Sequence, residues 1–533
     1  MEDLFLKLKS ENDQDFSQAL TTFVNNASYI VLLHYASVTK FEFLDKENFR
    51  SEIWEAIFLH LNSKEQYYIH EKCLATLRIL SRDKTNLDSI LTKEKLNVIL
   101  EYAGLNIKQE KYTISSVTNE AQKLLCNLLF NSPKIQTTLV ETSCLECVID
   151  RISKYNENNC HDTKLFDVRI IFLVTALNIS TRNFVCTELH GDIQLIKMLE
   201  NVLQYYSMDN REIKDNDATL TCEILKALFN LFYQPKDLTT EEMEIYEKLV
   251  FILRNLCFNN SKQHKENLIS NTVNLLTVIP KNCYSNLIVQ LPNNQQDLIL
   301  YKDVDMSTIN ILIIFLNNKL ECKTNLIENL SPILSCFIRM CKTERLIRKY
   351  TRMQVLPPLK DVLQRPEEGT TLRNKLCKLL TTPITEVRDL VAEFLFVLCK
   401  EKVGRMIKYT GYGNAAGMFA NKGLLGPDHA KVDYSSESED SETEEYEKYK
   451  EKINPVVGCY ESPKPNPLEG MTEEQKEYEA MKLVSLVDQL QRKGLIQPCR
   501  VGEDGKPKAI EHVLELKEQL PKQQIHRQES DSD

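Results

Sequence analysis

Cysteine and histidine residues between positions 144 and 161 have a spacing that could support chemistry. Cys144 and Cys147 form a C-x₂-C pair, and Cys160 with His161 could complete a set of four zinc ligands. However, the pair lies inside the apolar stretch LVETSCLECVIDRI, and no second C-x₂-C occurs in the sequence. We therefore expect these cysteines to be buried in a helix, and we assign the chain no metal and no cofactor.

Catalytic motifs are absent from the sequence. It contains no G-x-S-x-G, H-E-x-x-H or Walker pattern, and its nine histidines do not cluster with carboxylates. We therefore expect no catalytic residues and a protein that acts by binding.

A repeated leucine-rich signature carries amide and basic residues at regular intervals. Its central residues are Arg78, Asn127, Asn178 and Asn230, which are 49, 51 and 52 positions apart, and Asn255 breaks the spacing. On the inner helices of a helical stack, such asparagines could bond the backbone of a guest segment. They could equally cap or satisfy neighbouring turns, and the sequence leaves both interpretations open.

Basic and aromatic residues accompany this signature. Lys123 and Lys226 lie four residues before an asparagine, and Arg82 lies four after Arg78, so each pair shares a helix face. A solvated face is the commoner explanation for any single lysine or arginine. Together they predict a basic, amide-lined and aromatic groove, suited to a helix or tail ending in a carboxylate. The candidate groove residues are Arg78, Arg82, Lys123, Asn127, Asn178, Lys226, Phe229 and Asn230.

An acidic run from Asp433 to Glu447 contains eight carboxylates and no basic residue. Its composition predicts disorder, and the alternative to any specific role is a merely solvating linker. Ser436 and Ser441 each have an acidic residue three positions on, and Thr443 has one directly after it, which is the pattern that a casein kinase 2-type kinase selects. Phosphorylation would add about −1.5 to −2 charge per site.

The elements that must position these residues are helices. Only three of the fourteen glycines precede residue 400, so tight turns and phosphate-binding loops are scarce there. Leucine-rich stretches of helical length recur at somewhat more than the roughly 40–47 residues of an armadillo or HEAT repeat. We predict an all-α, armadillo/HEAT-like superhelical solenoid over residues 1–425.

A single amphipathic helix is predicted near the C-terminus. Thr472 can cap it, and its apolar stripe comprises Leu483, Val484, Val487 and Leu490. We assign residues 426–469 to an acidic, phosphorylatable and Pro-rich linker, 470–496 to this helix, and 497–533 to a disordered tail.

Charge and hydropathy argue against nucleic acid as the main partner and against a membrane-spanning segment. The net charge of −10 argues against nucleic acid as the main partner. The start MEDLFLKLKS is no signal peptide, and the longest apolar runs, such as Ile311–Leu316, are far too short to span a membrane. We expect a cytoplasmic chain whose scattered cysteines are buried and reduced.

Several segments resemble the synembryn family, also called resistance to inhibitors of cholinesterase. They are RILSRD, LLCNLLFNSP, LRNKLCKLL, VAEFLFVLCKEKVGRMIKYTGYGNAAG, SETEEY, INPVVG and NPLEGMTEEQKEYEAMKLV. The similarity extends from about Gln66 to Ile496.

This resemblance implies a guanine-nucleotide exchange factor and folding chaperone for heterotrimeric G-protein α subunits (Gα). It implies that Arg78, Arg82 and Asn127 contact the C-terminal helix of Gα and that the helix near residue 480 contacts its nucleotide-binding domain. It also implies activating phosphorylation at Ser441 and at either Ser435 or Ser436, a 1:1 complex, and recruitment to the cell cortex.

The alternative is a generic armadillo scaffold for peptide partners. Nuclear-import receptors of this shape use a ladder of tryptophans beside their asparagines to hold lysine-rich peptides. This chain has only Trp54, and its predicted groove is basic, which is the wrong charge for such peptides.

Overall fold

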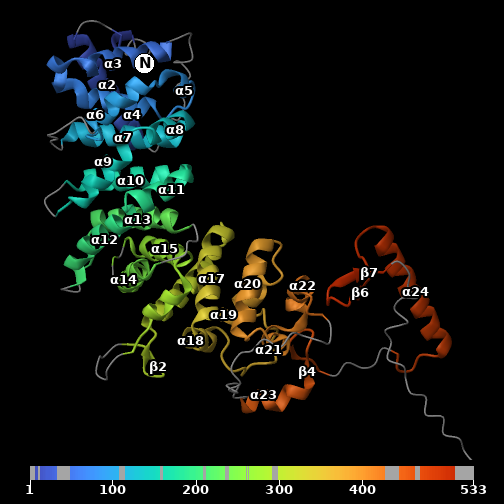
Figure 1. Ribbon diagram of the computed structural model, residues 1–533. Coiled ribbons are helices and arrows are strands. Elements are labelled where there is room, and N and C mark those ends of the chain that lie inside the picture. The colour runs from blue at the N-terminus through green and yellow to red at the C-terminus, as the bar shows by residue number, and fades with distance from the viewer. Residues whose placement is uncertain are drawn as a thin grey trace, which may run out of the picture. The chain divides into compact units, whose positions relative to one another are not determined.

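The computed structural model is an assembly of α-helices in two compact units, Met1–Val289 and Gln290–Asp533 (Figure 1). It describes residues 6–9, 13–32, 49–106, 115–156, 160–207, 212–233, 239–259, 261, 263–290, 298–425, 443–462 and 468–510. The prediction of an all-α, armadillo/HEAT-like fold is confirmed.

The described part of the first unit is built mainly of α-helices. Their bounds are α2 (Asp13–Leu32), α3 (Phe49–Asn62), α4 (His70–Leu80), α5 (Leu87–Ile90), α6 (Lys93–Tyr102), α7 (Ser116–Asn131), α8 (Pro133–Val140), α9 (Cys144–Ser153), α10 (His161–Leu177), α11 (Ser180–Asn183), α12 (Gly191–Ser207), α13 (Asp215–Phe232), α14 (Thr240–Cys257) and α15 (Lys265–Leu276). Short 3₁₀ segments η2 (Lys64–Ile69) and η4 (Lys281–Leu287) and a π-helical turn η3 (Phe184–Glu188) complete it, and the strand β1 (Val289–Gln290) spans the boundary between the two units.

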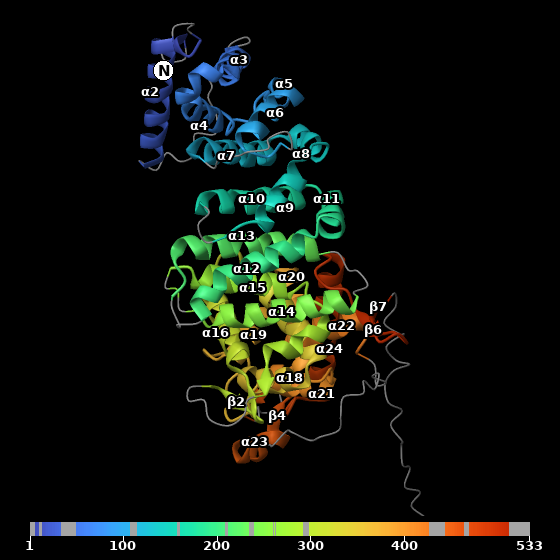
Figure 2. The ribbon, with the colours of Figure 1, turned by 60° about the vertical axis from the view of Figure 1, so that its left-hand side comes forward.

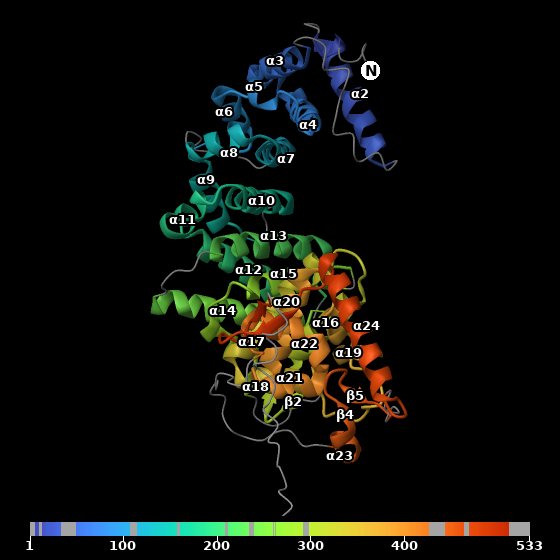
Figure 3. The same cartoon turned by 90° about the vertical axis from the view of Figure 1, so that its right-hand side faces the viewer.

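Helices α4, α7, α10 and α13 pack side by side in that order (Figure 2). In Figure 3, α6, α8, α9 and α11 form a second row beside them. The two rows bury leucines and isoleucines between them, as the apolar faces of stacked helices require. Local signals set the helix starts: Ser132, for example, caps α8 by accepting a hydrogen bond from the amide of Ile135, with Pro133 in the first turn.

The second unit is also mainly helical. Its elements are β2 (Leu300–Tyr301), β3 (Val304–Asp305), α16 (Ser307–Glu321), α17 (Leu326–Thr343), α18 (Arg345–Val355), α19 (Leu372–Leu379), α20 (Thr385–Leu398), α21 (Val403–Thr410), α22 (Tyr412–Lys422), α23 (Glu444–Tyr449), η5 (Lys450–Lys452), β4 (Ile453–Asn454), β5 (Cys459–Tyr460), α24 (Glu473–Arg492), β6 (Cys499–Val501) and β7 (Pro507–Ala509). Strands β2 and β3 are antiparallel, with Leu300 opposite Asp305. Helices α17 and α20 pack together through the rings of Phe337 and Phe394, whose centres are 5.6 Å apart.

Two stretches that we predicted to be a linker and a disordered tail contain a short helix and strands. Within the predicted linker, Glu444 to Tyr460 forms α23 and the antiparallel pair β4–β5. Gly458 there has φ +73°, and a Cβ on it would lie 2.8 Å from Cγ of Pro366, so this turn requires glycine. The expectation of a disordered tail from residue 497 is wrong for Cys499–Ala509, where β6 and β7 pair with Arg500 opposite Lys508.

The cysteines are unpaired and mostly buried. Burial raises the pKa of the Cys126 thiol to about 12, which keeps it protonated and unreactive at neutral pH. In the part of the chain that the structure describes, no helix has the length and apolarity needed to cross a membrane.

Candidate partner-binding groove

A hollow of about 880 Å³ opens on the first unit between α4, α7 and α10. It contains four of the eight predicted groove residues: Arg78, Arg82, Lys123 and Asn127. The others that line it are Asp83, Lys84, Thr85, Cys126, Phe130, Asn131, Phe166, Arg169 and Leu173. We call this feature the basic hollow.

Positive charge dominates the lining. Five cations and one carboxylate, Asp83, line the hollow, and Asp83 is already paired with buried Arg50 at 2.9 Å. Burial, together with the nearby Arg78 guanidinium, lowers the pKa of Arg82. An arginine guanidinium is not deprotonated in proteins at neutral pH, so Arg82 stays charged. Among the described residues, no carboxylate lies within ion-pairing distance of Arg82, so its charge is open to an anionic partner.

Asn127 connects two helices of the hollow. Its Nδ2 donates hydrogen bonds to the carbonyl oxygen of Arg78, at 3.0 Å, and to Oγ of Ser81, at 3.4 Å. The Ser81 hydroxyl in turn donates to the same Arg78 carbonyl at 2.8 Å. This asparagine therefore holds α7 against the end of α4, where the carbonyls of the last turn have no partner within the helix.

Asn230 makes the same connection between α10 and α13. Its Nδ2 donates to the carbonyl oxygen of Phe172 and to Oγ1 of Thr175, both at 3.1 Å. The sequence left open whether these asparagines bind a guest or satisfy neighbouring turns. Their amide nitrogens bond neighbouring helices, and only the amide oxygens make no hydrogen bond to a described residue.

Asn178 has a different role from the other two asparagines. It is the C-cap of α10, and its Oδ1 accepts from the amide and the hydroxyl of Ser180 at 3.1 and 2.7 Å. It does not line the hollow. Its contact with a partner stays a prediction, and the signature at residue 178 lies at the end of its helix, outside the lining of the basic hollow.

Lys226 and Phe229 lie on α13, outside the lining of the hollow. Lys226 pairs with Glu223 at 3.1 Å and lies over the ring of Phe172. The Phe229 ring packs against Tyr233, with ring centres 5.8 Å apart. The predicted groove residues thus lie on two separate helix pairs. Only those on and beside α4 and α7 line the basic hollow.

Helix α10 contributes lining residues that sequence reasoning missed. Phe166, Arg169 and Leu173 have spacings of three and four residues, so they share one helix face, and this signal was available in the sequence. Both Lys123 Nζ and the Arg169 guanidinium lie 5.5 Å from the centre of the Phe166 ring. The aromatic ring therefore forms part of the floor between two cations.

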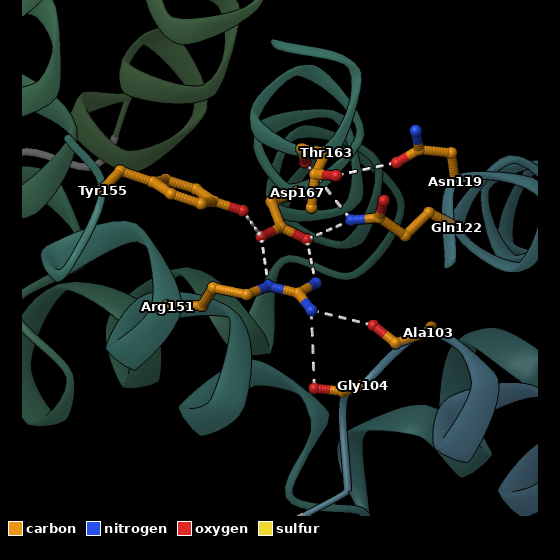
Figure 4. A network of polar contacts seen from close by, with 8 residues as sticks. All are labelled: Ala103, Gly104, Asn119, Gln122, Arg151, Tyr155, Thr163 and Asp167. Atoms are coloured by element: carbon orange, nitrogen blue, oxygen red, sulfur yellow. Dashed lines mark hydrogen bonds and ion pairs between the residues drawn. The ribbon is translucent and has the colours of Figure 1, made fainter. Parts of the chain in front are cut away.

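A buried ionic network fixes α10 behind these residues (Figure 4). The Asp167 carboxylate accepts hydrogen bonds from Nε and Nη2 of Arg151 at 2.7 and 2.5 Å. It also accepts from the Tyr155 hydroxyl and from Nε2 of Gln122, both at 2.5 Å. Arg151 further donates to the carbonyl of Ala103 at 2.8 Å. The network thus connects α7, α9, α10 and the end of α6, and it fixes the helix that carries the groove aromatic.

The predicted C-terminal helix forms as α24. Thr472 caps it, with its hydroxyl accepting from the amide of Gln475, as the sequence indicated. Its apolar stripe is exposed, with fractions of 62% for Leu483 and 67% for Val484. Val487 and Leu490 are exposed by 38% and 39%. Such a face on a helix in water favours a partner surface.

Of the predicted phosphorylation sites, Ser435, Ser436 and Ser441 lie outside the described residues. Thr443 is described and is the N-cap of α23, where its hydroxyl accepts from the amide of Tyr446 at 3.1 Å. The same hydroxyl donates to the carbonyl of Leu359. Modification of Thr443 would therefore have to break two existing contacts.

Of the residues considered as a zinc site, Cys144 and Cys147 lie within α9, and Cys160 and His161 lie at the start of α10. Cys144 is buried, which raises the pKa of its thiol well above the usual range. Within the described ranges, no group of three or more His, Cys, Asp or Glu side chains is arranged to hold a metal ion.

Comparison with known proteins identifies relatives over most of the chain. Residues 73–506 match the family model Ric8, described as guanine nucleotide exchange factor synembryn. "Chaperone Ric-8A" of Xenopus tropicalis is 39% identical, with 91% of this chain and 92% of the relative covered. "Chaperone Ric-8" of Drosophila pseudoobscura pseudoobscura is 35% identical, covering 92% and 94%. A designed armadillo repeat protein is similar at 14% identity and a TM-score of 0.34, over 53% of this chain and 98% of that chain. The chain therefore belongs to the Ric8 family of synembryn-type guanine nucleotide exchange factors.

Proposed function

We propose that the chain is a guanine-nucleotide exchange factor and folding chaperone for heterotrimeric G-protein α subunits. It binds GDP-bound or newly made Gα free of Gβγ and acts without covalent catalysis. Membership of the Ric8 family supports the partner class. The observation that carries the proposal is the basic hollow, in which Arg82 is charged and has no ion pair among the described residues.

The C-terminal helix of Gα is the segment that suits the hollow. The guanidinium groups of Arg78 and Arg82 can take carboxylates or helix-end carbonyls, because arginine presents several donors in a planar fork. The free amide oxygen of Asn127 can accept from a guest amide. Phe166 and Phe130 supply apolar surface for the same guest.

Helix α24 supplies a second contact in this proposal. Its exposed stripe of Leu483, Val484, Val487 and Leu490 would cover an apolar surface of the Gα nucleotide-binding domain. Two separate contacts on one Gα molecule raise the effective concentration of the second after the first has formed.

Exchange then follows from thermodynamic linkage. Drawing the C-terminal helix of Gα into the hollow favours a Gα conformation that holds GDP weakly. GDP must in return weaken the grip of this chain on Gα by the same factor. GTP binding favours the closed Gα and releases the chain, while a nucleotide-free Gα stays protected.

Regulation and location complete the proposal. A casein kinase 2-type kinase phosphorylates the acidic linker at Ser435 or Ser436, at Ser441 and at Thr443, and the chain acts as a monomer in a 1:1 complex. It works in the cytoplasm and is recruited to the cell cortex, as part of G-protein signalling.

The test measures both binding and exchange. The phosphorylated chain should bind nucleotide-free Gα and accelerate uptake of a GTP analogue. The double variant Arg78→Ala, Arg82→Ala should weaken Gα binding by about 3–6 kcal/mol, or about 100- to 10,000-fold, since each charge-assisted hydrogen bond contributes about 1.5–3 kcal/mol. Lys93→Ala is the matched control, because this exposed lysine pairs with Glu141 outside the hollow. Wild-type Gα affinity in the double variant would refute the proposed binding face.

A further inference from the structure

Glu120 bridges two cations at the basic hollow. It lies on α7, and its two carboxylate oxygens accept from Nε of Arg78 on α4 at 2.8 Å and from Nζ of Lys123 at 2.9 Å. The Glu120 side chain is only 13% exposed, so the bridge is shielded from bulk solvent. Glu120 does not line the hollow, whereas both cations do.

A similar bridge recurs on the next helix pair, where the single oxygen Oε1 of Glu223 accepts from both cations. Glu223 on α13 pairs with Arg169 of α10 at 3.0 Å and with Lys226 at 3.1 Å. Both carboxylates belong to an E-x-x-K-x-x-x-N pattern, which starts at Glu120 and again at Glu223. In both copies the final asparagine bonds a carbonyl of the preceding inner helix. The recurrence of a carboxylate that pairs with an arginine of the preceding inner helix and with the lysine three residues on argues that the carboxylate is part of the groove's construction.

The bridge determines how Arg78 is presented. Because the Glu120 carboxylate accepts the hydrogen bond from Arg78 Nε–H, both Nη groups of Arg78 remain, and no described residue accepts a hydrogen bond from them. These two groups form one planar edge of the guanidinium, which fits both oxygens of a carboxylate. A long side chain already held in its binding conformation loses less entropy when a partner arrives.

We propose that Glu120 is a positioning residue for partner binding, which holds Arg78 and Lys123 ready for a carboxylate-bearing helical segment. Glu223 has the same role for Arg169 and Lys226 on the following helix pair. This inference rests on the proposed function, since it concerns how the hollow takes the C-terminal helix of Gα.

Electrostatics alone predicts that removing the Glu120 carboxylate strengthens partner binding. A carboxylate near the hollow reduces its positive potential, so removing that charge should strengthen the attraction for an anionic guest. A positioning role instead requires that its removal weakens binding, because Arg78 and Lys123 then sample other rotamers. The direction of the change in affinity therefore separates the two effects.

The experiment measures binding of a synthetic peptide, the C-terminal helix of a Gα subunit with a free carboxylate, to the full-length chain by fluorescence anisotropy. Glu120→Ala should raise Kd about tenfold, mainly through faster dissociation. Glu120→Gln should weaken binding less than Glu120→Ala, because the glutamine Oε1 can still accept from Arg78 Nε, whereas its NH₂ group can no longer hold the Lys123 ammonium. In an Arg78→Ala background, Glu120→Ala should change Kd less than about twofold.

A matched control comes from the second unit. Glu393 there bridges Lys342, at 2.5 Å, and Lys422, so Glu393→Ala removes the same kind of bridge without touching the hollow. It should leave peptide affinity unchanged. Circular dichroism melts of every variant separate lost binding from lost folding.

Three results would overturn the proposal. They are unchanged or tighter binding by Glu120→Ala, equal weakening by the alanine and glutamine variants, and a full effect of Glu120→Ala in the Arg78→Ala background. If Arg78→Ala weakens binding while Glu120→Ala does not, the proposed function stands and only the positioning role falls. Failure of the wild-type chain to bind the peptide would count against the proposed function and against this inference with it.

Discussion

Replacing Asp167 with asparagine tests whether the buried ionic network holds the groove helix. The substitution keeps the shape of the side chain, removes its charge and turns one acceptor into an NH₂ donor. That donor would meet Arg151, Tyr155 or Gln122, each of which now donates to the carboxylate (Figure 4). Since the Asp167 side chain is fully buried, its partners cannot turn to water.

The expected loss of stability is large for a substitution that replaces one carboxylate oxygen. Breaking a buried ion pair by removing one partner costs about 3–5 kcal/mol, because the remaining charge of Arg151 stays uncompensated. For a unit the size of Met1–Val289, this corresponds to a fall in Tm of roughly 6–20 °C. Because α10 carries Phe166 and Arg169, peptide affinity should also fall at temperatures where the unit remains folded.

The assay is thermal unfolding followed by circular dichroism, with the urea midpoint as a second measure. Asp150→Asn on α9 is the control, since it makes the same chemical change in an ion pair with Lys154 that is largely exposed. Exposed pairs contribute about 0–1 kcal/mol, so the control should shift Tm by no more than a few degrees. A Tm of the Asp167 variant within about 2 °C of wild type would refute the reasoning, because the network would then contribute less than one exposed pair.

Three further perturbations follow from single contacts. Arg82→Ala should weaken peptide binding by about 1.5–3 kcal/mol without lowering Tm, as measured by anisotropy and by melting, because Arg82 has no ion pair within the described ranges. Asn230→Ala should lower the free energy of unfolding by about 1–3 kcal/mol, since it leaves the Phe172 carbonyl without this donor. Asn178→Ala should lower it less, because the hydrogen bonds of Asn178 stay within one turn. Urea titration compares the two variants. Burial lowers the pKa of His70, so the folded chain takes up a proton less readily than the unfolded chain. The free energy of unfolding is therefore greatest above about pH 6.5 and falls as the pH drops below that value. His70→Gln should flatten this dependence in thermal melts across that pH range.

Local signals identified helices better than they identified contacts. The Thr472 cap and the apolar stripe of α24 were both readable, because capping and amphipathic spacing depend on residues close in sequence. The sequence did not predict that Asn178 is a C-cap, because the same local pattern fits both an inner-face position and a C-cap. Only the packing of α10 against α13 distinguishes them, and there the asparagine that bonds α10 is Asn230.

The hairpin β6–β7 was missed although a signal existed. Asp504 and Gly505 stand between two short segments, and Gly505 has φ +70°, the left-handed conformation that such turns use. The flanking residues are polar, with Arg500 opposite Lys508, so no apolar alternation marked the strands. Composition suggested disorder where turn chemistry favoured a hairpin.

The charged residues of the hollow differ in how far they also support the fold. The main chain of Arg78 accepts a hydrogen bond from Asn127, and its side chain holds Glu120, so changes at any of these three alter the helix stack as well as the surface. Arg82 contributes charge to the hollow without an ion pair to any described residue. Its replacement therefore reports on partner binding with the least disturbance of the stack. An effect of Arg82→Ala on Gα binding with unchanged Tm would thus be stronger evidence for the groove than a larger effect at Asn127.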